Sequence, residues 1–226
     1  LAGKATITIS DGDTTGMTAE TLHKIGNATT GDVTVTNAAA ISGKYEDVTK
    51  AIVDGATKVL AAKSTITISD SDSTPMTAVT LHKIGNATTG DVSVTNAAAI
   101  SGDYADLKKA LVDGDTKVVL KKASTPITIG NVVNVEEGAK IAVVDNATAV
   151  YSQGVTDVYA KFHNGSGGIS DNLKEVKKDD ADVNITISDG NTTPMDAATL
   201  HNIGNATTGD VTVTNAAAIS GKYEDV

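Results

Sequence analysis

The sequence predicts an α/β fold in which about four units of roughly 59 residues form a repetitive strand–helix solenoid. Three observations lead to this prediction. The segment from Leu22 to Gly43 recurs almost unchanged from Leu81 and again from Leu200. Short alternating strand patterns precede helix-like stretches in each copy. Aromatic residues make up only 3% of the chain and Cys is absent, which argues against a compact core of large rings and excludes disulfides.

The spacing of the copies divides the chain. Leu81 follows Leu22 by one period, but Leu200 follows Leu81 by two periods and one residue, so a degenerate copy is expected between them. Ile127–Gly130 and Asn146–Thr148 supply traces of that copy. We therefore expect repeat units at residues 1–59, 60–122, 123–182 and 183–226, the third degenerate and the fourth truncated.

The first strand of a unit is predicted from alternation. Ile7 and Ile9 alternate with Thr, and Val33 and Val35 repeat the pattern 26 residues later. Because β-branched Thr suits the outer face of a pleated strand, the aliphatic side chains are expected to face the core. Successive coils would then stack in parallel, about 4.8 Å apart, as in leucine-rich-repeat-like solenoids.

Each strand is followed by a predicted helix. In the first helix, Leu22 and Ile25 are apolar neighbours, while Glu20 lies in the first turn and Lys24 in the last, where the helix dipole favours them. Gly26 is expected to end this helix. The second helix is expected to end at Gly55, with an apolar stripe at Tyr45, Val48, Ile52 and Val53.

Asparagines follow the second strand of three units at one register, at Asn37, Asn96 and Asn215. Stacked Asn side chains can satisfy backbone groups of a turn in the neighbouring coil. We therefore expect a structural Asn ladder. The small residues Ala38, Ala39 and Ala40 predict a tightly packed turn beside it.

Pairs of acidic or amide side chains follow the first strand of three units. Oxygen ligands spaced by two residues in a turn are typical of Ca²⁺ sites, and Ca²⁺ is the one cofactor that the sequence suggests. In the alternative, these residues form Asx turns that bond nearby backbone, and no Glu lies near enough to act as a bidentate ligand. The pairs are Asp11 with Asp13, Asp70 with Asp72, and Asp189 with Asn191.

Asn-x-Thr triplets recur with the repeat and are candidate glycosylation sites, at Asn27, Asn86, Asn146 and Asn205. His23, His82 and His201 also share one register. One His in every 59 residues would place the copies two coils apart, near 10 Å, which is too far to share a metal ion. These histidines are expected on the helix surface.

The charge pattern excludes several classes of partner. The chain carries 28 acidic and 18 basic residues, all of the latter Lys, for a net charge of -10. Without a basic patch, binding to nucleic acid or to anionic lipid is not expected. No apolar run approaches the length of a membrane span, so no membrane insertion is expected.

The repeat combines a T-x-S-D strand end, a T-L-x-x-I helix, an A-T-T-G turn, a V-T-V-T strand and a small-residue turn. In this it resembles the Ala/Thr-rich tandem repeats of very large bacterial surface proteins, especially cyanobacterial extracellular proteins that also carry calcium-binding nonapeptide modules. The resemblance implies an extracellular, structural role at the cell surface. The chain has no nonapeptide run, so calcium binding is not implied by the resemblance.

The expected function is a structural repeat segment of an extracellular surface filament, sheath or S-layer-type assembly. Both ends fall inside the repeat pattern without polar caps, so we expect a homo-oligomer that associates end to end, or a segment of a longer array.

No G-x-S-x-G, phosphate-loop or H-E-x-x-H motif is present, so an enzyme is not expected. One alternative is an adhesin stalk that contacts glycans or cells through the irregular region 131–182. The other is a polysaccharide-active solenoid enzyme, which so few aromatic residues disfavour.

Overall fold

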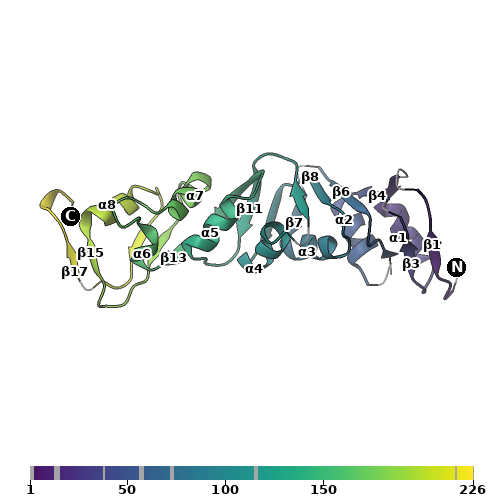
Figure 1. The fold of residues 1–226 in the computed structure, drawn as a ribbon, viewed down its shortest axis with the longest axis horizontal. Coiled ribbons are helices and arrows are strands. Elements are labelled where there is room, and N and C mark those ends of the chain that lie inside the picture. Colours follow the sequence, from purple (N-terminus) through teal and green to yellow (C-terminus); the bar gives the residue numbers. More distant parts are fainter. Residues whose placement is uncertain are drawn as a thin grey trace. The chain divides into compact units, whose positions relative to one another are not determined.

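The computed structural model describes residues 3–12, 16–37, 39–55, 59–71, 74–114, 117–216 and 218–225. They form an α/β structure of short parallel strands and short helices (Figure 1). The chain divides into two compact units, residues 1–125 and 126–226. The first contains the first two expected repeats, and the division into four repeats stays a prediction.

In the first compact unit, one parallel sheet has the order β1 (Ile7–Ile9), β3 (Val33–Val35) and β5 (Val59–Leu60). Ile7 lies opposite Val33, and Val33 lies opposite Val59, so each strand pairs with one 26 residues further along the chain. The predicted parallel pairing of these strands is confirmed.

A second parallel sheet runs through both expected repeats of this compact unit. Its order is β2 (Gly16–Thr18), β4 (Ala40–Gly43), β6 (Thr65–Ser69), β8 (Val92–Asn96) and β10 (Val118–Leu120). Ile41 of β4 pairs with Met17 on one side and with Ile66 on the other. The sheet therefore takes two strands from residues 1–59 and three from residues 60–122.

A further strand pair, β7 (Pro75–Thr77) and β9 (Ala99–Gly102), repeats the pairing of β2 with β4. The sequence did not predict these four strands, and the tight turn expected at Ala38–Ala40 is wrong at its end, because Ala40 begins β4. Ala38 lies outside the described residues. Each strand carries a single large apolar side chain, so no alternation marks it.

The predicted helices are present. Helices α1 (Ala19–Asn27) and α3 (Ala78–Asn86) end one residue after the expected glycine. The side chain of Thr18 caps α1 by accepting a hydrogen bond from the Thr21 backbone N–H at 3.3 Å. Helices α2 (Tyr45–Val48) and α4 (Tyr104–Leu107) continue into π-helical turns, η1 (Thr49–Val53) and η2 (Lys108–Val112).

The second compact unit begins with neighbouring strands β11 (Thr125–Ile129) and β12 (Ala147–Tyr151). Strands β13 (Val155–Asp157), β14 (Ile185–Ile187) and β16 (Val211–Val213) form a parallel sheet, and β15 (Pro194–Asp196) pairs with β17 (Ala218–Ser220). The helices are α5 (Val135–Ala142), α6 (Tyr159–Phe162), α7 (Asp171–Asp179), α8 (Ala197–Gly204) and the 3-10 turn η3 (Tyr223–Asp225).

Small aliphatic side chains fill the interior of the first compact unit, among them Ile66, Ile68 and Leu81, which are fully buried. The second compact unit differs because it buries Phe162, the chain's single Phe. Within the described ranges, no helix is long and apolar enough to cross a membrane.

Candidate functional site

The side chains that recur with the repeat converge where one coil meets the next. Asp70 follows β6 and is only 7% exposed. One of its carboxylate oxygens accepts a hydrogen bond from the backbone N–H of Tyr45, the first residue of α2. Because the first N–H groups of a helix have no partner within the helix, a carboxylate from the neighbouring coil stabilises them.

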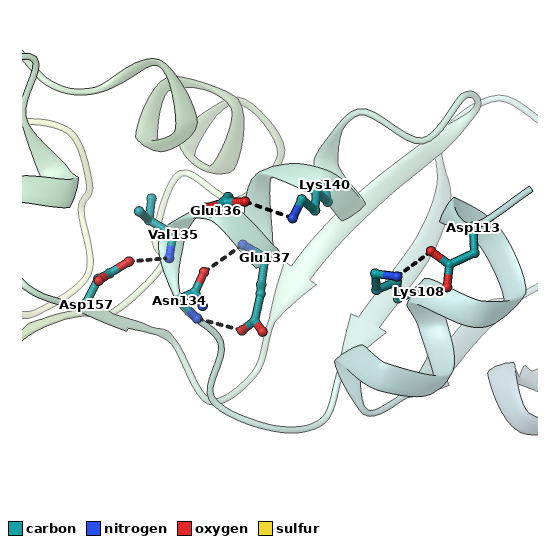
Figure 2. Close-up of polar contacts among 8 residues, drawn as sticks. All are labelled: Lys108, Asp113, Asn134, Val135, Glu136, Glu137, Lys140 and Asp157. Carbon is teal, nitrogen blue, oxygen red and sulfur yellow. Dashed lines mark hydrogen bonds and ion pairs between the residues drawn. The ribbon is translucent and has the colours of Figure 1, made fainter.

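The same contact recurs in the second compact unit. Asp189, equally buried, accepts a hydrogen bond from the backbone N–H of Tyr159, the first residue of α6. Asp157 approaches the first N–H of α5, at Val135, with a distance of 3.3 Å. Figure 2 shows this carboxylate beside the capping box of α5, in which Asn134 and Glu137 bond each other's backbone.

The tyrosine at each of these helix starts makes a second contact. The hydroxyl of Tyr45 accepts a hydrogen bond from the backbone N–H of Thr77 at 3.1 Å, and that of Tyr159 accepts one from Asp196 at 3.2 Å. Thr77 and Asp196 occupy one register of the repeat, and they cap helices α3 and α8. A two-point clamp therefore joins successive coils: a carboxylate on the Tyr backbone and the Tyr hydroxyl on a helix start.

The A-T-T-G turn also joins coils. Thr88 donates its hydroxyl hydrogen to the carbonyl of Ser64, and the same hydroxyl accepts from the backbone N–H of Gly90 at 3.0 Å. Thr89 donates its backbone N–H to the carbonyl of Ala62 at 2.8 Å. Thr29 and Thr207 repeat the hydroxyl contact to carbonyls 24 residues earlier.

The glycine of this turn leaves no room for a side chain. A Cβ at Gly31 would lie 2.7 Å from the carbonyl carbon of Ala5, and one at Gly90 would lie 2.8 Å from that of Ser64. At Gly209 it would lie 2.8 Å from the carbonyl oxygen of Val183. Close backbone approach therefore explains why the repeat keeps glycine here.

The expected Asn ladder has one member with visible bonds. Asn37 donates its side-chain amide to the carbonyls of Ser10, at 3.2 Å, and Asp11, at 2.6 Å, in the preceding coil. Asn96 ends β8 opposite Ser69, and Asn215 is exposed after β16.

The acidic pairs are only partly visible, because Asp13 and Asp72 lie outside the described residues. Asp11 and Asn191 are exposed. The bonds of Asp70 and of Asp189 reach backbone 25 and 30 residues away, rather than the nearby backbone of an Asx turn. In the described part of the chain, no three His, Asp or Glu side chains gather as a metal site would require. Calcium binding at the pairs stays a prediction.

The candidate glycosylation residues Asn27, Asn86, Asn146 and Asn205 are exposed. The amide nitrogens of the first two lie close to the Nε2 atoms of His23, at 3.0 Å, and His82, at 2.9 Å, one helical turn earlier. Asn146 has a positive φ of 62° and leads into β12, so the expected echo of the A-T-T-G turn is wrong at this position.

The irregular region 131–182 turns its aromatic side chains inward. The hydroxyl of Tyr151 donates to the carbonyl of Gly138 at 2.9 Å, and burial raises the pKa of this phenol. The ring of Tyr159 lies 4.5 Å from that of His163. Glu136 pairs with Lys140 along the surface of α5, at 2.9 Å (Figure 2).

One carboxylate of this region is perturbed. Asp180 accepts a hydrogen bond from the backbone N–H of Tyr151 at 2.8 Å. Burial raises its pKa, and neighbouring Asp182 adds to the rise.

Comparison with known proteins gives no relative: no family model matches the sequence, and neither a curated protein nor a solved structure matches it. The contacts between coils are thus the chain's own evidence for what it does.

Proposed function

We propose that this chain is a structural repeat segment of an extracellular surface filament, sheath or S-layer-type assembly. It is built as a strand–helix solenoid and associates end to end with further copies of itself. The observation that carries the proposal is the sheet from β2 to β10, in which β4 of the first repeat pairs with β6 of the second. One repeat thereby completes the sheet of the next.

The energetics of that junction favour association. Ile41 and Ile66, which face each other across it, are buried to within 1%. Burying one such side chain is worth about 1.5–3 kcal/mol. When repeats contact only their neighbours, much of the stability comes from these interfaces, so an uncovered end loses it. A second copy that covers the end recovers this contribution.

The use of the repeated polar side chains supports a structural role. Asp70, Thr88 and Asn37 all bond backbone groups of a neighbouring coil. A catalytic group is needed once, whereas these residues recur in several copies. The proposal therefore assigns the chain no catalytic step.

The extracellular location in this proposal rests on the resemblance to bacterial surface repeats. The exposed side chains agree with a hydrated outer surface, because the strands carry Thr outward and the net charge is -10.

The alternatives have less support. An adhesin that binds glycans through residues 131–182 would present aromatic faces to sugars, as would a polysaccharide-active enzyme. Tyr151, Tyr159 and Phe162 are instead buried. Binding of the intact chain to an array of surface glycans tests the adhesin, and release of reducing sugar from acidic polysaccharides tests the enzyme.

Sedimentation velocity over a range of protein concentrations tests the proposed function. We expect the mean sedimentation coefficient to rise with concentration, and to rise further with added salt, which screens the repulsion between acidic copies. A single species with the mass of one chain at every concentration and salt level would contradict end-to-end association.

A further inference from the structure

The junction inside the first compact unit shows what covers one face of a repeat. Helix α2 and its extension η1 pack against α3 and β6. Under this cover, Ile68, Met76 and Ile84 of the second repeat are fully buried. Tyr45 anchors the cover through Asp70 and Thr77, as described above.

The equivalent face of the first repeat is open. Ile9, Met17 and Ile25 stand at the positions of Ile68, Met76 and Ile84, 59 residues earlier, and each is partly exposed. They line an open cavity of about 530 Å³.

Both anchor positions of the clamp also line this cavity. Asp11 corresponds to Asp70, and Thr18 corresponds to Thr77. The first repeat thus presents the polar and the apolar parts of the junction without the segment that fills it.

The second compact unit presents the missing segment. The sequence Lys-Tyr-Glu-Asp-Val at residues 44–48 recurs at residues 222–226. Tyr223, the counterpart of Tyr45, is 100% exposed. Ile219 of β17, the counterpart of Ile41, is 50% exposed, whereas Ile41 is 1% exposed. One face lacks a cover, and a cover of matching sequence lacks a face.

We propose that residues 218–224 of one copy of this chain dock on the open face of the first repeat of a second copy. This inference rests on the proposed function, since it specifies the joint by which copies associate. The internal junction sets the register: as Ile41 pairs with Ile66 and Ser42 with Thr67, Ile219 lies beside Ile7 and Ser220 beside Thr8 of the next copy.

The docked tyrosine fills the cavity. Its backbone N–H donates to the carboxylate of Asp11, and its hydroxyl lies at the start of α1, beside Thr18. The occupant is a second copy because the segment that fills the equivalent site inside the chain has this same sequence. Burial of Ile9, Met17 and Ile25 removes from water the apolar surface that drives association.

Disulfide cross-linking tests the register directly, because the chain has no cysteine of its own. Chains carrying both Thr8→Cys and Ser220→Cys should form a ladder of covalent oligomers under mild oxidation. A disulfide needs Cα atoms closer than about 7 Å. Thr34 lies one strand further into the sheet, so Thr34→Cys combined with Ser220→Cys should give no ladder.

The internal junction supplies the positive control. Ser42→Cys with Thr67→Cys places two cysteines at paired positions inside one chain, and it should close an intramolecular bond.

The tyrosine is tested by sedimentation equilibrium. Tyr223→Ala should weaken association at least about tenfold, because it removes a large buried ring, and Tyr223→Phe about two- to tenfold through the lost hydroxyl contact. Since Tyr223 is fully exposed in the single chain, its unfolding curve should stay unchanged.

The outcomes separate the joint from the function. A ladder specific to Thr8→Cys with Ser220→Cys, together with weakened association of Tyr223→Ala, supports the joint. Association that is unaffected by Tyr223→Ala and shows no register-specific ladder overturns the joint and leaves the proposed function standing. Chains that stay monomeric under all conditions overturn both.

Discussion

The A-T-T-G turn makes the sharpest prediction about stability. At Gly90, an added Cβ would lie 2.8 Å from the carbonyl carbon of Ser64. Ordinary carbon–carbon contacts are about 3.5–4.0 Å, so the turn must retreat from the preceding coil by roughly 1 Å. The backbone of Ser64 belongs to the coil and cannot yield as the end of a flexible side chain would.

That retreat stretches the bonds that lock the turn. The backbone N–H of Thr89 donates to Ala62 at 2.8 Å, and the hydroxyl of Thr88 donates to Ser64. Overpacking costs about 1–3 kcal/mol, and a weakened hydrogen bond adds about 1 kcal/mol. The entropy lost by the unfolded chain offsets about 0.4–1 kcal/mol. We expect Gly90→Ala to lower the free energy of unfolding by about 2–3 kcal/mol.

Urea unfolding followed by circular dichroism measures this change. Gly12→Ala is the matched control, because no atom lies within 4 Å of its added Cβ and its φ is not in the left-handed region. The control should be unchanged or slightly more stable. Equal unfolding midpoints for Gly90→Ala and Gly12→Ala would refute close backbone approach as the reason for the glycine.

Three further predictions follow from the contacts between coils. Asp70→Ala removes the acceptor of the Tyr45 N–H and should cost about 1–3 kcal/mol in urea unfolding, whereas exposed Asp11→Ala should cost less than about 0.5 kcal/mol; equal losses would contradict the cap. Tyr151→Phe should cost about 1 kcal/mol, measured by thermal unfolding, and an unchanged midpoint would contradict a role for its bond to Gly138. Because burial raises the pKa of Asp180, the folded chain holds this proton more tightly than the unfolded chain. Its stabilisation is therefore full below the ordinary pKa of 3.8 and is lost as the pH rises through the raised value. Asp180→Asn should flatten the fall in unfolding free energy just above that pH, and an unchanged slope would contradict the assignment.

Local patterns predicted much of the fold. Ile7 and Ile9 alternate with Thr, and Val33 and Val35 repeat this pattern, so both parallel strands could be read directly. The first helix was equally readable, because its apolar spacing and its terminal charges agree. The side-chain pattern within one element carries enough information for these elements.

The junction between repeats was not predicted, for a physical reason. Strand β4 has one large side chain, Ile41, and its identity as a strand depends on neighbours that lie 24 and 25 residues away. The cap on Tyr45 comes from Asp70, and nothing in a repeated sequence says which copies touch. The recurrence of the acidic residue was visible, but its partner was sought in the nearby backbone.

The degenerate third repeat shows the limit of reading by analogy. Asn146-Ala-Thr matches the triplet at Asn86, yet it enters β12 instead of forming the turn. The glycine that permits close approach at Gly90 is missing, since Val150 stands four residues after Asn146. Without that glycine the backbone cannot approach its neighbour in the same way.

Negative-stain electron microscopy of the purified chain, with Ca²⁺ and then with a chelator, tests the central claim most directly. Joints made of strands, Tyr223 and apolar cover require no metal ion, so filaments or sheets many chains long are predicted in both conditions. Separate particles of one chain in both conditions, at concentrations where the protein is abundant on the grid, would contradict end-to-end association.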